Sequence, residues 1–464
     1  MCQSKANGGR RCADASAYAA SRSSLQSRAR YHASKGHEVK VDELHTAQTH
    51  LAHAHRLWGD HVTHYPHFDL PQPVFQFLEG FRADGLTPLI VGGSVRDSIL
   101  HSASKDIDVE VYGGDYSVVA ESLRQRGYIA NEVGRAFGVL KTRLSNGDEL
   151  DISIPRTENR TGSGHRGFAV DTSQTLTVEE ASSRRDFTIN AVAYSHRHHV
   201  LIDPHNGVKD MEAGMLRHVS GAFSEDPLRS WRGFQFAARF NMDLHPETAA
   251  VCRNMLSEAP HLAEERVREE WMKFYHKAVS PSRGLTVLHD TEWDRTLPGL
   301  RDANSASLRE ETDLLAGKPR LLAAAITRRL PEGQQRGFLN ATVVGNREQR
   351  AIYHLAKTPA PTSLAEARSA ARGLATHRVT VEEVLTFAEL TDQGHTPGLL
   401  ENVREAGVAT SPEPSWVDGR ELMTLHADRR PGPWLGEMVA RANALQDSRT
   451  ARDRDHLLAL LSED

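Results

Sequence analysis

Hydrophobic and polar residues follow two different patterns along the chain of 464 residues. Between residue 71 and about residue 215, short apolar or alternating segments predict strands, and segments with helical spacing separate them. From residue 228 onward, almost every apolar segment has the spacing of a helix. The predicted strands are TPLIV (87–91), DIDVEVY (106–112), FGVLKTRL (137–144) and ELDISIP (149–155). The pattern therefore predicts a small α/β domain followed by a long helical body.

The first 70 residues are rich in Ala, Ser, His and Arg and show no strong strand pattern. One helix is predicted over residues 44–61, and the remainder is expected to be mobile. Five histidines lie between His45 and His61, which raises the possibility of a metal site. A solvated polar helix is the favoured interpretation.

Composition narrows the class of protein. Charged residues make up 25% of the chain, and no apolar run approaches the roughly 18 residues that span a bilayer. The N-terminus has no apolar signal segment, and the three cysteines give no disulfide framework. These features predict a cytoplasmic protein with no membrane partner. The net charge of −5 neither supports nor excludes an RNA partner, because binding requires only a local group of cations.

Two acids are the first candidates for chemistry. In a strand, residues i and i+2 point to the same face, so Asp106 and Asp108 are predicted to lie side by side. Such carboxylates repel each other unless a cation lies between them, and hard oxygen ligands suit Mg²⁺. Glu110 shares this face and is expected to be a solvated or supporting acid. Without further features, an exposed strand edge remains the simpler interpretation.

A pair of glycines upstream of these acids favours a functional site over an exposed strand edge. Gly92 and Gly93 follow the strand TPLIV, where a backbone without side chains can approach a ligand closely. The next residues open a predicted helix, whose first amides attract anions, and Arg96 can add a charged fork to a phosphate oxygen. A predicted phosphate-binding turn thus lies just upstream of the acid pair. Asp151, on the strand ELDISIP, is a third carboxylate if that strand pairs beside the others, and three carboxylates could hold two Mg²⁺ ions.

Four ordered motifs resemble those of the class II tRNA nucleotidyltransferase and poly(A) polymerase family. They are GGSVRD (92–97), KDIDVEVYG (105–113), RRDFTINAVAYS (184–195) and EDPLRSWRGFQFAARF (225–240). The resemblance implies an α+β protein with a nucleotidyltransferase (polymerase beta-like) α/β head, followed by an all-helical neck, body and tail. The expected domains are an N-terminal extension (1–70), the catalytic head (71–215), a neck for nucleotide selection (216–283) and an RNA-binding body and tail (284–464).

The resemblance also implies an activity, which is the template-independent addition of CMP and AMP from CTP and ATP to a tRNA 3′ end, with Mg²⁺ as cofactor. Addition of CCA, of part of it, or of a poly(A) tail all remain open. Two rivals are a catalytically silent RNA-binding protein and a small-molecule nucleotidyltransferase. The first predicts lost metal acids, and the second does not require the long helical body.

Residue roles carried over from the family follow the motifs. Asp106 and Asp108 are expected to bind metal with Asp151 in support, while Gly92, Gly93 and Arg96 meet the triphosphate. Arg185 is expected to contact the nucleotide's phosphates, and Asp186 and Asn190 to orient the ribose and phosphates.

The segment EDPLRSWR carries the predicted choice of base. If Asp226 and Arg229 lie three apart on a helix, they share a face. A carboxylate accepts a hydrogen bond from the exocyclic amine of C or A, and an arginine donates to the neighbouring ring nitrogen, so the pair imitates a base-pair edge. Glu225 is expected to hold Arg229, and Arg232 to lie near the base or phosphates. The alternative is an ordinary surface salt bridge.

Other features carry weaker signals. Five basic residues around the head are candidates for RNA contact, although a solvated surface role fits each equally well: Arg135, Lys141, Arg143, Arg156 and Arg166. Some family members carry a phosphohydrolase domain marked by spaced His and His-Asp ligands. His289 and Asp290 form the one such pair noted in this chain, so that activity is expected to be absent.

Overall fold

The computed structural model divides into two compact units, and the division falls between Asp226 and Pro227. The residues that it describes are 41–66, 68–102, 107–129, 131–134, 139–155, 157–160, 168–171, 176–392 and 394–462. For 41–48, 131–134, 157–160 and 168–171 only the backbone is described. The division falls inside the predicted neck, 216–283, and the boundaries predicted for the four domains remain a prediction. None of the described helices has both the length and the apolar composition needed to cross a bilayer.

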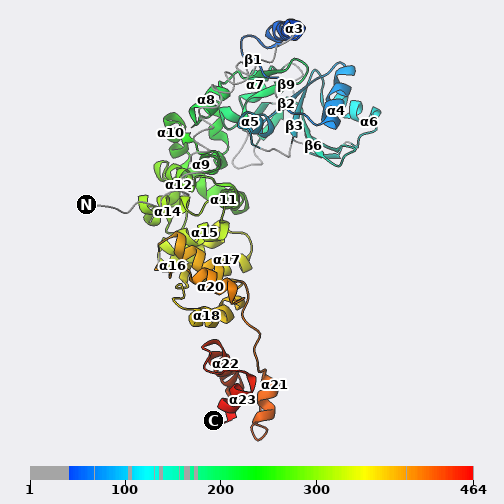
Figure 1. Ribbon diagram of the computed structural model, residues 1–464. Coiled ribbons are helices and arrows are strands. Elements are labelled where there is room, and N and C mark those ends of the chain that lie inside the picture. The colour runs from blue at the N-terminus through cyan, green and yellow to red at the C-terminus, as the bar shows by residue number, and fades with distance from the viewer. Residues whose placement is uncertain are drawn as a thin grey trace, which may run out of the picture. The chain divides into compact units, whose positions relative to one another are not determined.

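An eight-stranded mixed sheet forms the centre of the first unit (Figure 1). Its strand order is β1-β10-β9-β2-β3-β6-β5-β4, with β2 antiparallel and β6 parallel to β3. The four predicted strands are confirmed, although the described part of DIDVEVY begins at Ile107. The strands are β1 (Val62–His64), β2 (Thr87–Val91), β3 (Ile107–Tyr112), β4 (Asn131–Gly134), β5 (Val139–Arg143), β6 (Glu149–Ser153), β9 (Ala193–Ser195) and β10 (Val200–Ile202).

Helices cover both faces of this sheet. The alternation of β3 directs Val109 and Val111 into the core, and both are fully buried, as are Phe77, Phe81 and Leu123 of the helices beside the sheet. The helices of this unit are α3 (Val41–Trp58), α4 (Gln72–Ala83), α5 (Gly93–Ile99), α6 (Tyr116–Gln125), α7 (Val178–Ser182) and α8 (Gly207–Ala213), with 3₁₀ turns η2 (Thr188–Asn190) and η3 (Gly221–Glu225). A separate hairpin joins β7 (Thr157–Arg160) to β8 (Phe168–Asp171), and a short strand, β11, covers Met215–Leu216.

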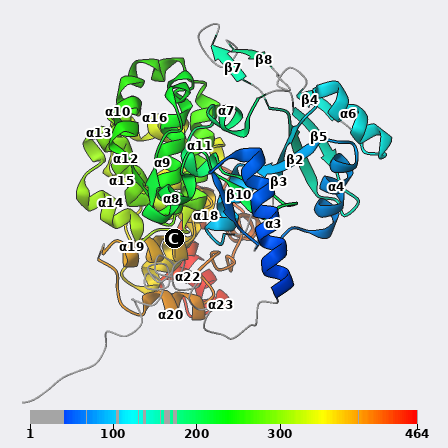
Figure 2. The ribbon, with the colours of Figure 1, turned by 90° about the horizontal axis from the view of Figure 1, so that it is seen from above.

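The helix predicted in the N-terminal extension is present as α3, and it is not fully solvated. It lies beside β10 (Figure 2), and its Ala54 is buried in a cluster with Val62, Val200 and Ile202. Leu51 packs against the same cluster. The histidine spacing of α3 therefore coexists with a narrow apolar stripe that docks the helix on the sheet.

Histidines from α3 also meet the turn between β9 and β10. The rings of His53 and His198 stack with centroids 5.0 Å apart, and His198 Nδ1 lies 3.0 Å from Ser195 Oγ. Burial, followed by the charge of His53, lowers the pKa of His198 to about 4. Among the residues that the structure describes, no group of three or more His, Cys, Asp or Glu side chains is placed to hold a metal ion.

The second unit is helical, as the pattern predicts, apart from the short strand β12 (Asp243–Leu244). Its helices are α9 (Leu228–Phe240), α10 (Pro246–Asn254), α11 (Glu264–Lys277), α12 (Pro281–Asp290), α13 (Leu300–Ala303), α14 (Ala306–Asp313), α15 (Pro319–Arg329), α16 (Glu332–Thr342), α17 (Asn346–Lys357), α18 (Leu364–Thr376), α19 (Val381–Leu390), α20 (Leu399–Glu405), α21 (Gly419–Leu425), α22 (Pro433–Asp447) and α23 (Arg454–Ser462), with 3₁₀ turns η4 (Leu256–His261) and η5 (Trp293–Thr296).

Aromatic packing holds the first of these helices together. Trp231 and Phe234 of α9 meet Trp271 of α11, and ring centroids of Phe234 and Trp271 lie 4.7 Å apart. Gly284 of α12 permits close approach, because a Cβ there would lie 2.8 Å from the carbonyl oxygen of Phe234. Rings in such offset contacts contribute roughly 0.5–1.5 kcal/mol per pair beyond their area.

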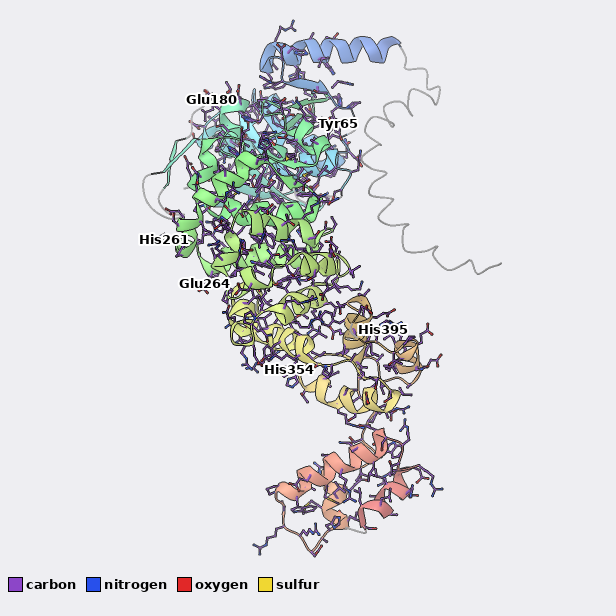
Figure 3. All side chains as sticks on the ribbon, turned by 90° about the vertical axis from the view of Figure 1, so that its left-hand side faces the viewer. Tyr65, Glu180, His261, Glu264, His354 and His395 are labelled. Carbon is purple, nitrogen blue, oxygen red and sulfur yellow. The ribbon has the colours of Figure 1, made fainter. Side chains whose placement is uncertain are left out.

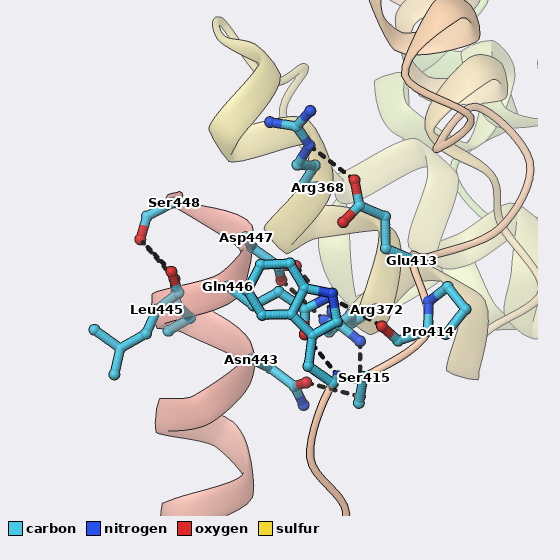
Figure 4. Close-up of polar contacts among 12 residues, drawn as sticks. Arg368, Arg372, Glu413, Pro414, Ser415, Asn443, Leu445, Gln446, Asp447 and Ser448 are labelled. Atoms are coloured by element: carbon cyan, nitrogen blue, oxygen red, sulfur yellow. Dashed lines mark hydrogen bonds and ion pairs between the residues drawn. The ribbon is translucent and has the colours of Figure 1, made fainter. Parts of the chain in front are cut away.

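A polar joint connects α18 to the three C-terminal helices (Figure 4). Arg372 Nε and Nη2 donate to the two carboxylate oxygens of Asp447, each over 2.9 Å, and Asp447 is 3% exposed. Gln446 Nε2 donates to the carbonyl oxygen of Pro414 over 2.9 Å. Directional hydrogen bonds of this kind fix the joint within this unit more specifically than apolar contact does.

Candidate active site

Two carboxylates share one face of the sheet in the first unit. Asp108 on β3 and Asp151 on β6 are register partners in a parallel pair, so their side chains point to the same side. Neither residue is buried. The third predicted acid, Asp106, lies outside the described residues, and the predicted group of three carboxylates therefore remains a prediction. The structure brings together the other two.

Gly92 shapes the turn beside Asp108. Its φ of 74° and ψ of −135° are strained for any residue with a side chain. A Cβ at this position would lie 3.0 Å from Arg185 Nη1 and 3.3 Å from Asp108 Oδ2. Asp108 and Arg185, far apart in sequence, thus border the same glycine turn. Gly93 is the first residue of α5, and a Cβ there would lie 3.4 Å from Arg96 Nη2.

Arg96, which is expected to add a charged fork to a phosphate oxygen, has its guanidinium engaged by neighbouring side chains in the structure. It is 5% exposed, and its Nε and Nη2 both engage Asp97 Oδ1, over 2.8 and 2.6 Å. Its Nη1 donates to Asn190 Oδ1 over 2.5 Å, and Asn190 Nδ2 donates to Asp186 Oδ1 over 2.9 Å. Asp186 also accepts the backbone amide of Phe187 over 2.8 Å. The predicted nucleotide ligands Arg96, Asp186 and Asn190 are therefore linked in one buried hydrogen-bond network.

Glu110 is buried, so of the two roles expected for it, a solvated or a supporting acid, the structure excludes the solvated one. It is 2% exposed. Arg184 Nη2 donates to Glu110 Oε1 over 3.2 Å, and the Tyr112 hydroxyl donates to Oε2 over 2.7 Å. Burial, followed by the charge of Glu110, raises the pKa of Tyr112 well above its usual value. This pair supports the strand next to Asp108.

Lys141 has a partner that the sequence did not predict. Its Nζ lies 2.8 Å from Asp151 Oδ1 and 2.9 Å from Oδ2, across the antiparallel pair β5–β6. The hydrogen bond and charge of Asp151 raise the pKa of Lys141. Contact of Lys141 with RNA remains a prediction. Arg143 pairs with Glu149, while Arg135, Arg156 and Arg166 lie outside the described residues.

The acid pair fits a divalent cation. Asp108 and Asp151 present hard oxygen donors on one face, and the ammonium of Lys141 already lies against one of these carboxylates. Two neighbouring carboxylates that attract the ammonium of a lysine can also attract a divalent metal ion, which reduces the repulsion between them.

The residues predicted to select the base occupy different local structures. Glu225 ends η3, and Asp226 follows in extended backbone with φ −122° and ψ 102°. Helix α9 begins only at Leu228, because Pro227 lies at its N-cap position. Asp226 is therefore not on the helix that carries Arg229, and the argument from a shared helical face is wrong. On α9, the guanidinium of Arg232 lies 4.9 Å from the centroid of the Phe236 ring.

His289 lies beside a buried carboxylate that also binds an arginine. Its Nδ1 lies 3.5 Å from Asp294 Oδ2, and Asp294 is fully buried and also accepts from Arg301 Nη1 over 3.1 Å. The adjacent Asp290 ends α12.

Sequence reasoning missed three side chains of this region. Asp97 follows Arg96 within GGSVRD, and Arg184 precedes Arg185 within RRDFTIN, so both motifs contained the missing partner. Tyr112 is the third member of the series Asp108, Glu110 and Tyr112 on one strand face. That two-residue period was the signal that could have found it.

Comparison with known proteins places this geometry in context. Residues 89–217 match the family described as the poly A polymerase head domain. The chain is 40% identical over 208 residues to the multifunctional CCA protein of Xanthomonas axonopodis pv. citri, covering 44% of this chain and 48% of that protein. It is 38% identical over 255 residues to the CCA-adding enzyme of Bordetella bronchiseptica, covering 53% and 66%. The chain thus spans about half to two thirds of the length of these two curated relatives.

Solved structures share the fold. The CCA-adding enzyme of Bacillus stearothermophilus in complex with CTP has a TM-score of 0.67 at 22% identity, covering 84% of this chain and 96% of that one. The Thermotoga maritima CCA-adding enzyme complexed with tRNA has a TM-score of 0.57 at 17% identity, covering 86% and 98%. Residues 89–217 of this chain therefore match the poly A polymerase head domain, in agreement with the family resemblance of its motifs.

Proposed function

We propose that this protein is a template-independent RNA nucleotidyltransferase that adds CMP and AMP, from CTP and ATP, to the 3′ end of tRNA. One observation carries the proposal: Asp108, the register partner of Asp151, lies beside a glycine turn that Arg185 also borders. A polyanionic nucleotide needs close backbone approach and a cation, whereas a hydroxyl nucleophile needs activation. The names of relatives, which are CCA proteins and CCA-adding enzymes, support the choice of substrate.

Mg²⁺ is the proposed cofactor, with Asp106, Asp108 and Asp151 as its proposed ligands. When bound, the metal would supply Lewis-acid stabilisation of the phosphoryl group and lower the pKa of the attacking hydroxyl. Asp108 and Asp151 would contribute the oxygen donors, and Lys141 would have to release Asp151 for both of its oxygens to become available. The second metal remains part of the proposal.

The glycine turn and the network behind it would position the triphosphate. We propose that the half-buried Arg185, next to Gly92, donates to phosphate oxygens. Arg96 is instead a proposed positioning residue, because its guanidinium is engaged by Asp97 and Asn190. Through Asn190 and Asp186 it would hold the RRDFTIN segment, with Gly93 allowing close packing over Arg96. A nucleotide would then meet an already ordered site.

Base selection is proposed for Asp226 and Arg229, with Glu225 and Arg232 in support. Their proposed role rests on the chemistry of a carboxylate and a guanidinium meeting the edge of C or A, and no longer on a shared helical face. Extended backbone at Asp226 leaves that side chain unconstrained by helical spacing.

The product of the reaction distinguishes a CCA-adding enzyme from the alternative activities. Purified protein incubated with Mg²⁺, CTP, ATP and a tRNA lacking its 3′ end should yield the CCA terminus, read by sequencing. A tail of A residues would identify a poly(A) polymerase, and partial products a CC- or A-adding enzyme. Absence of any addition, with retained RNA binding, would leave the silent RNA-binding protein. A cytoplasmic location is also proposed, from the cysteine content and the composition.

A further inference from the structure

A buried ion pair joins the strand that carries Asp108 to the segment that carries Arg185. Glu110 lies two residues after Asp108 on β3, and Arg184 directly precedes Arg185. Arg184 Nη2 donates to Glu110 Oε1 over 3.2 Å, and the two side chains are 19% and 2% exposed. The strand and the segment that border the Gly92 turn are therefore also connected behind it.

Both carboxylate oxygens of Glu110 have a donor. The Tyr112 hydroxyl donates to Oε2 over 2.7 Å from the same face of β3, while Arg184 donates to Oε1. Tyr112 packs against the apolar cluster that contains Leu89 and Val91, and Leu89 is the register partner of Glu110. The carboxylate is therefore held in one orientation by two donors within an apolar surrounding.

Helix α7 holds the other side of this pair. A capping box of Thr177 and Glu180, which is labelled in Figure 3, begins the helix. Val178 is buried in the same apolar cluster of the sheet, and the Arg185 amide donates to the carbonyl oxygen of Ser182 over 3.0 Å. The chain therefore enters the RRDFTIN segment from a helix that is itself docked on the sheet.

The position of the Arg185 guanidinium depends on its backbone. Its Nη1 donates to the carbonyl oxygen of Asn190 over 3.3 Å, which is long for a hydrogen bond. A Cβ at Gly92 would lie 3.0 Å from the same nitrogen. Since a hydrogen bond of this length holds a guanidinium weakly, the neighbouring Arg184 decides where the charge of Arg185 lies.

Stability alone does not account for a buried ion pair at this place. Charges removed from water carry a large desolvation cost, and apolar side chains of similar volume are often as stable or more stable there. A charge-assisted hydrogen bond, in contrast, fixes the direction between donor and acceptor. The direction fixed by Glu110 and Arg184 is that between β3 and the RRDFTIN segment.

We propose that Glu110 is a positioning residue for the nucleotide. Through its ion pair with Arg184, it holds Arg185 in the orientation that receives a triphosphate. The inference deepens the function proposed above and rests on it. Donors that are already placed need no rearrangement when the nucleotide binds, and a misplacement of 1 Å can cost on the order of 100-fold in rate. Glu110 itself contacts neither the nucleotide nor the metal in this proposal.

Binding of CTP by the full chain, with Mg²⁺ and without RNA, tests this proposal. Glu110→Gln keeps the shape of the side chain and removes the charge that Arg184 meets. The Kd for CTP should rise about tenfold or more, because the phosphates lose a charge-assisted hydrogen bond from Arg185. In the addition assay the KM for CTP should rise in parallel, while the KM for tRNA should change less than about twofold.

Two further variants separate positioning from stability. Glu110→Met/Arg184→Met replaces the ion pair by apolar side chains, so thermal unfolding should stay close to that of the wild type. Its CTP binding should nevertheless remain weak, because the fixed direction is lost. Arg184→Lys keeps the charge, and since one guanidinium nitrogen reaches Glu110 it should retain most of the CTP affinity.

Asp84 provides a matched control. It forms an ion pair with Arg126 over 3.6 Å between the ends of α4 and α6, and neither residue borders the Gly92 turn. Asp84→Asn removes the same charge from a part-buried pair. It should leave the Kd for CTP unchanged.

The outcomes separate this inference from the proposed function. Unchanged CTP binding in Glu110→Gln, or wild-type CTP binding in the double Met variant, would overturn the inference even if the wild-type protein adds nucleotides. A wild-type protein that binds CTP but adds none, and whose Glu110→Gln variant binds CTP weakly, would overturn the proposed function and leave the inference standing. Absence of CTP binding by the wild type would overturn both.

Discussion

Lys141 Nζ holds both carboxylate oxygens of Asp151, over 2.8 and 2.9 Å, on the sheet face where Asp108 is the register partner of Asp151. Lys141, Asp151 and Asp108 therefore lie next to one another on three adjacent strands, and Lys141 is paired with Asp151, a proposed metal ligand. Metal binding and this ion pair compete for the same oxygen atoms.

Lys141→Met should lower the Mg²⁺ concentration needed for half-maximal nucleotide addition. Exposed ion pairs contribute about 0.2–1 kcal/mol, so we expect a shift of roughly two- to fivefold. Titration of Mg²⁺ in the addition assay measures it, and Lys141→Arg is the control that keeps the charge. An unchanged Mg²⁺ requirement would show that Asp151 is not a ligand or that Lys141 does not compete.

Asp108→Asn should abolish nucleotide addition while leaving the fold intact. Changing groups that only support metal ligands costs 10- to 100-fold, so loss of a ligand should cost about 100-fold or more. Asp108 is not buried, so thermal unfolding should change little. Initial rates with CTP and ATP measure the effect, with Asp148→Asn in an exposed turn as the control. Undiminished activity would remove Asp108 from the metal site.

Gly92→Ala should impair use of the nucleotide more than it impairs folding. The backbone conformation of Gly92 costs roughly 1–3 kcal/mol for an L side chain, and the new Cβ would press on Arg185 Nη1 and Asp108 Oδ2. We expect a raised KM for CTP, measured by steady-state kinetics. Gly147→Ala, at another positive φ with open space around it, is the control for strain alone. Equal effects of the two substitutions would contradict the role of the Gly92 turn.

Asp97→Ala should destabilise the first unit strongly, because it leaves the buried guanidinium of Arg96 without its carboxylate partner. Breaking one side of a buried ion pair typically costs about 3–5 kcal/mol. Urea unfolding monitored by circular dichroism measures this value. Asp97→Asn retains part of the hydrogen bonding and should cost less. If both variants are as stable as the wild type, the buried network does not support the site.

Docking of α3 should weaken on acidification. His198, whose ring stacks on that of His53 in α3, has a pKa lowered to about 4, chiefly by burial, below the ordinary value of 6.5. Its neutral form therefore favours the docked state, and this contribution is complete above pH 6.5 and is lost as the pH falls toward 4. Amide exchange of α3 at pH 7.5 and pH 5 measures it. His198→Gln should reduce the pH dependence, and identical exchange at both values would contradict the expectation.

Local sequence patterns predicted much of the first unit. The strand that begins at Ile107 followed from its alternation, and Gly92 followed from the turn after an apolar strand. The same reasoning left open whether Glu110 is a solvated or a supporting acid. Its burial depends on Arg184 and Tyr112 closing over it, and only the tertiary structure brings Arg184 there.

Helix boundaries show a second kind of failure. Asp226 and Arg229 have helical spacing in the sequence, but Pro227 lies at the N-cap of α9, and Asp226 precedes the helix in extended backbone. The rule that proline prefers the start of a helix was available from sequence and would have shortened the predicted helix.

By itself, the sequence determined which segments are strands and helices, and which residue types cluster in its motifs, because periods of 2 and 3.6 residues are properties of the local backbone. The tertiary structure alone decided that Asp151 pairs in register with Asp108, that Lys141 binds Asp151, and that Arg96 meets Asn190. These contacts join residues distant in the chain, and strand register and burial arise from packing of the whole unit, which no local pattern records.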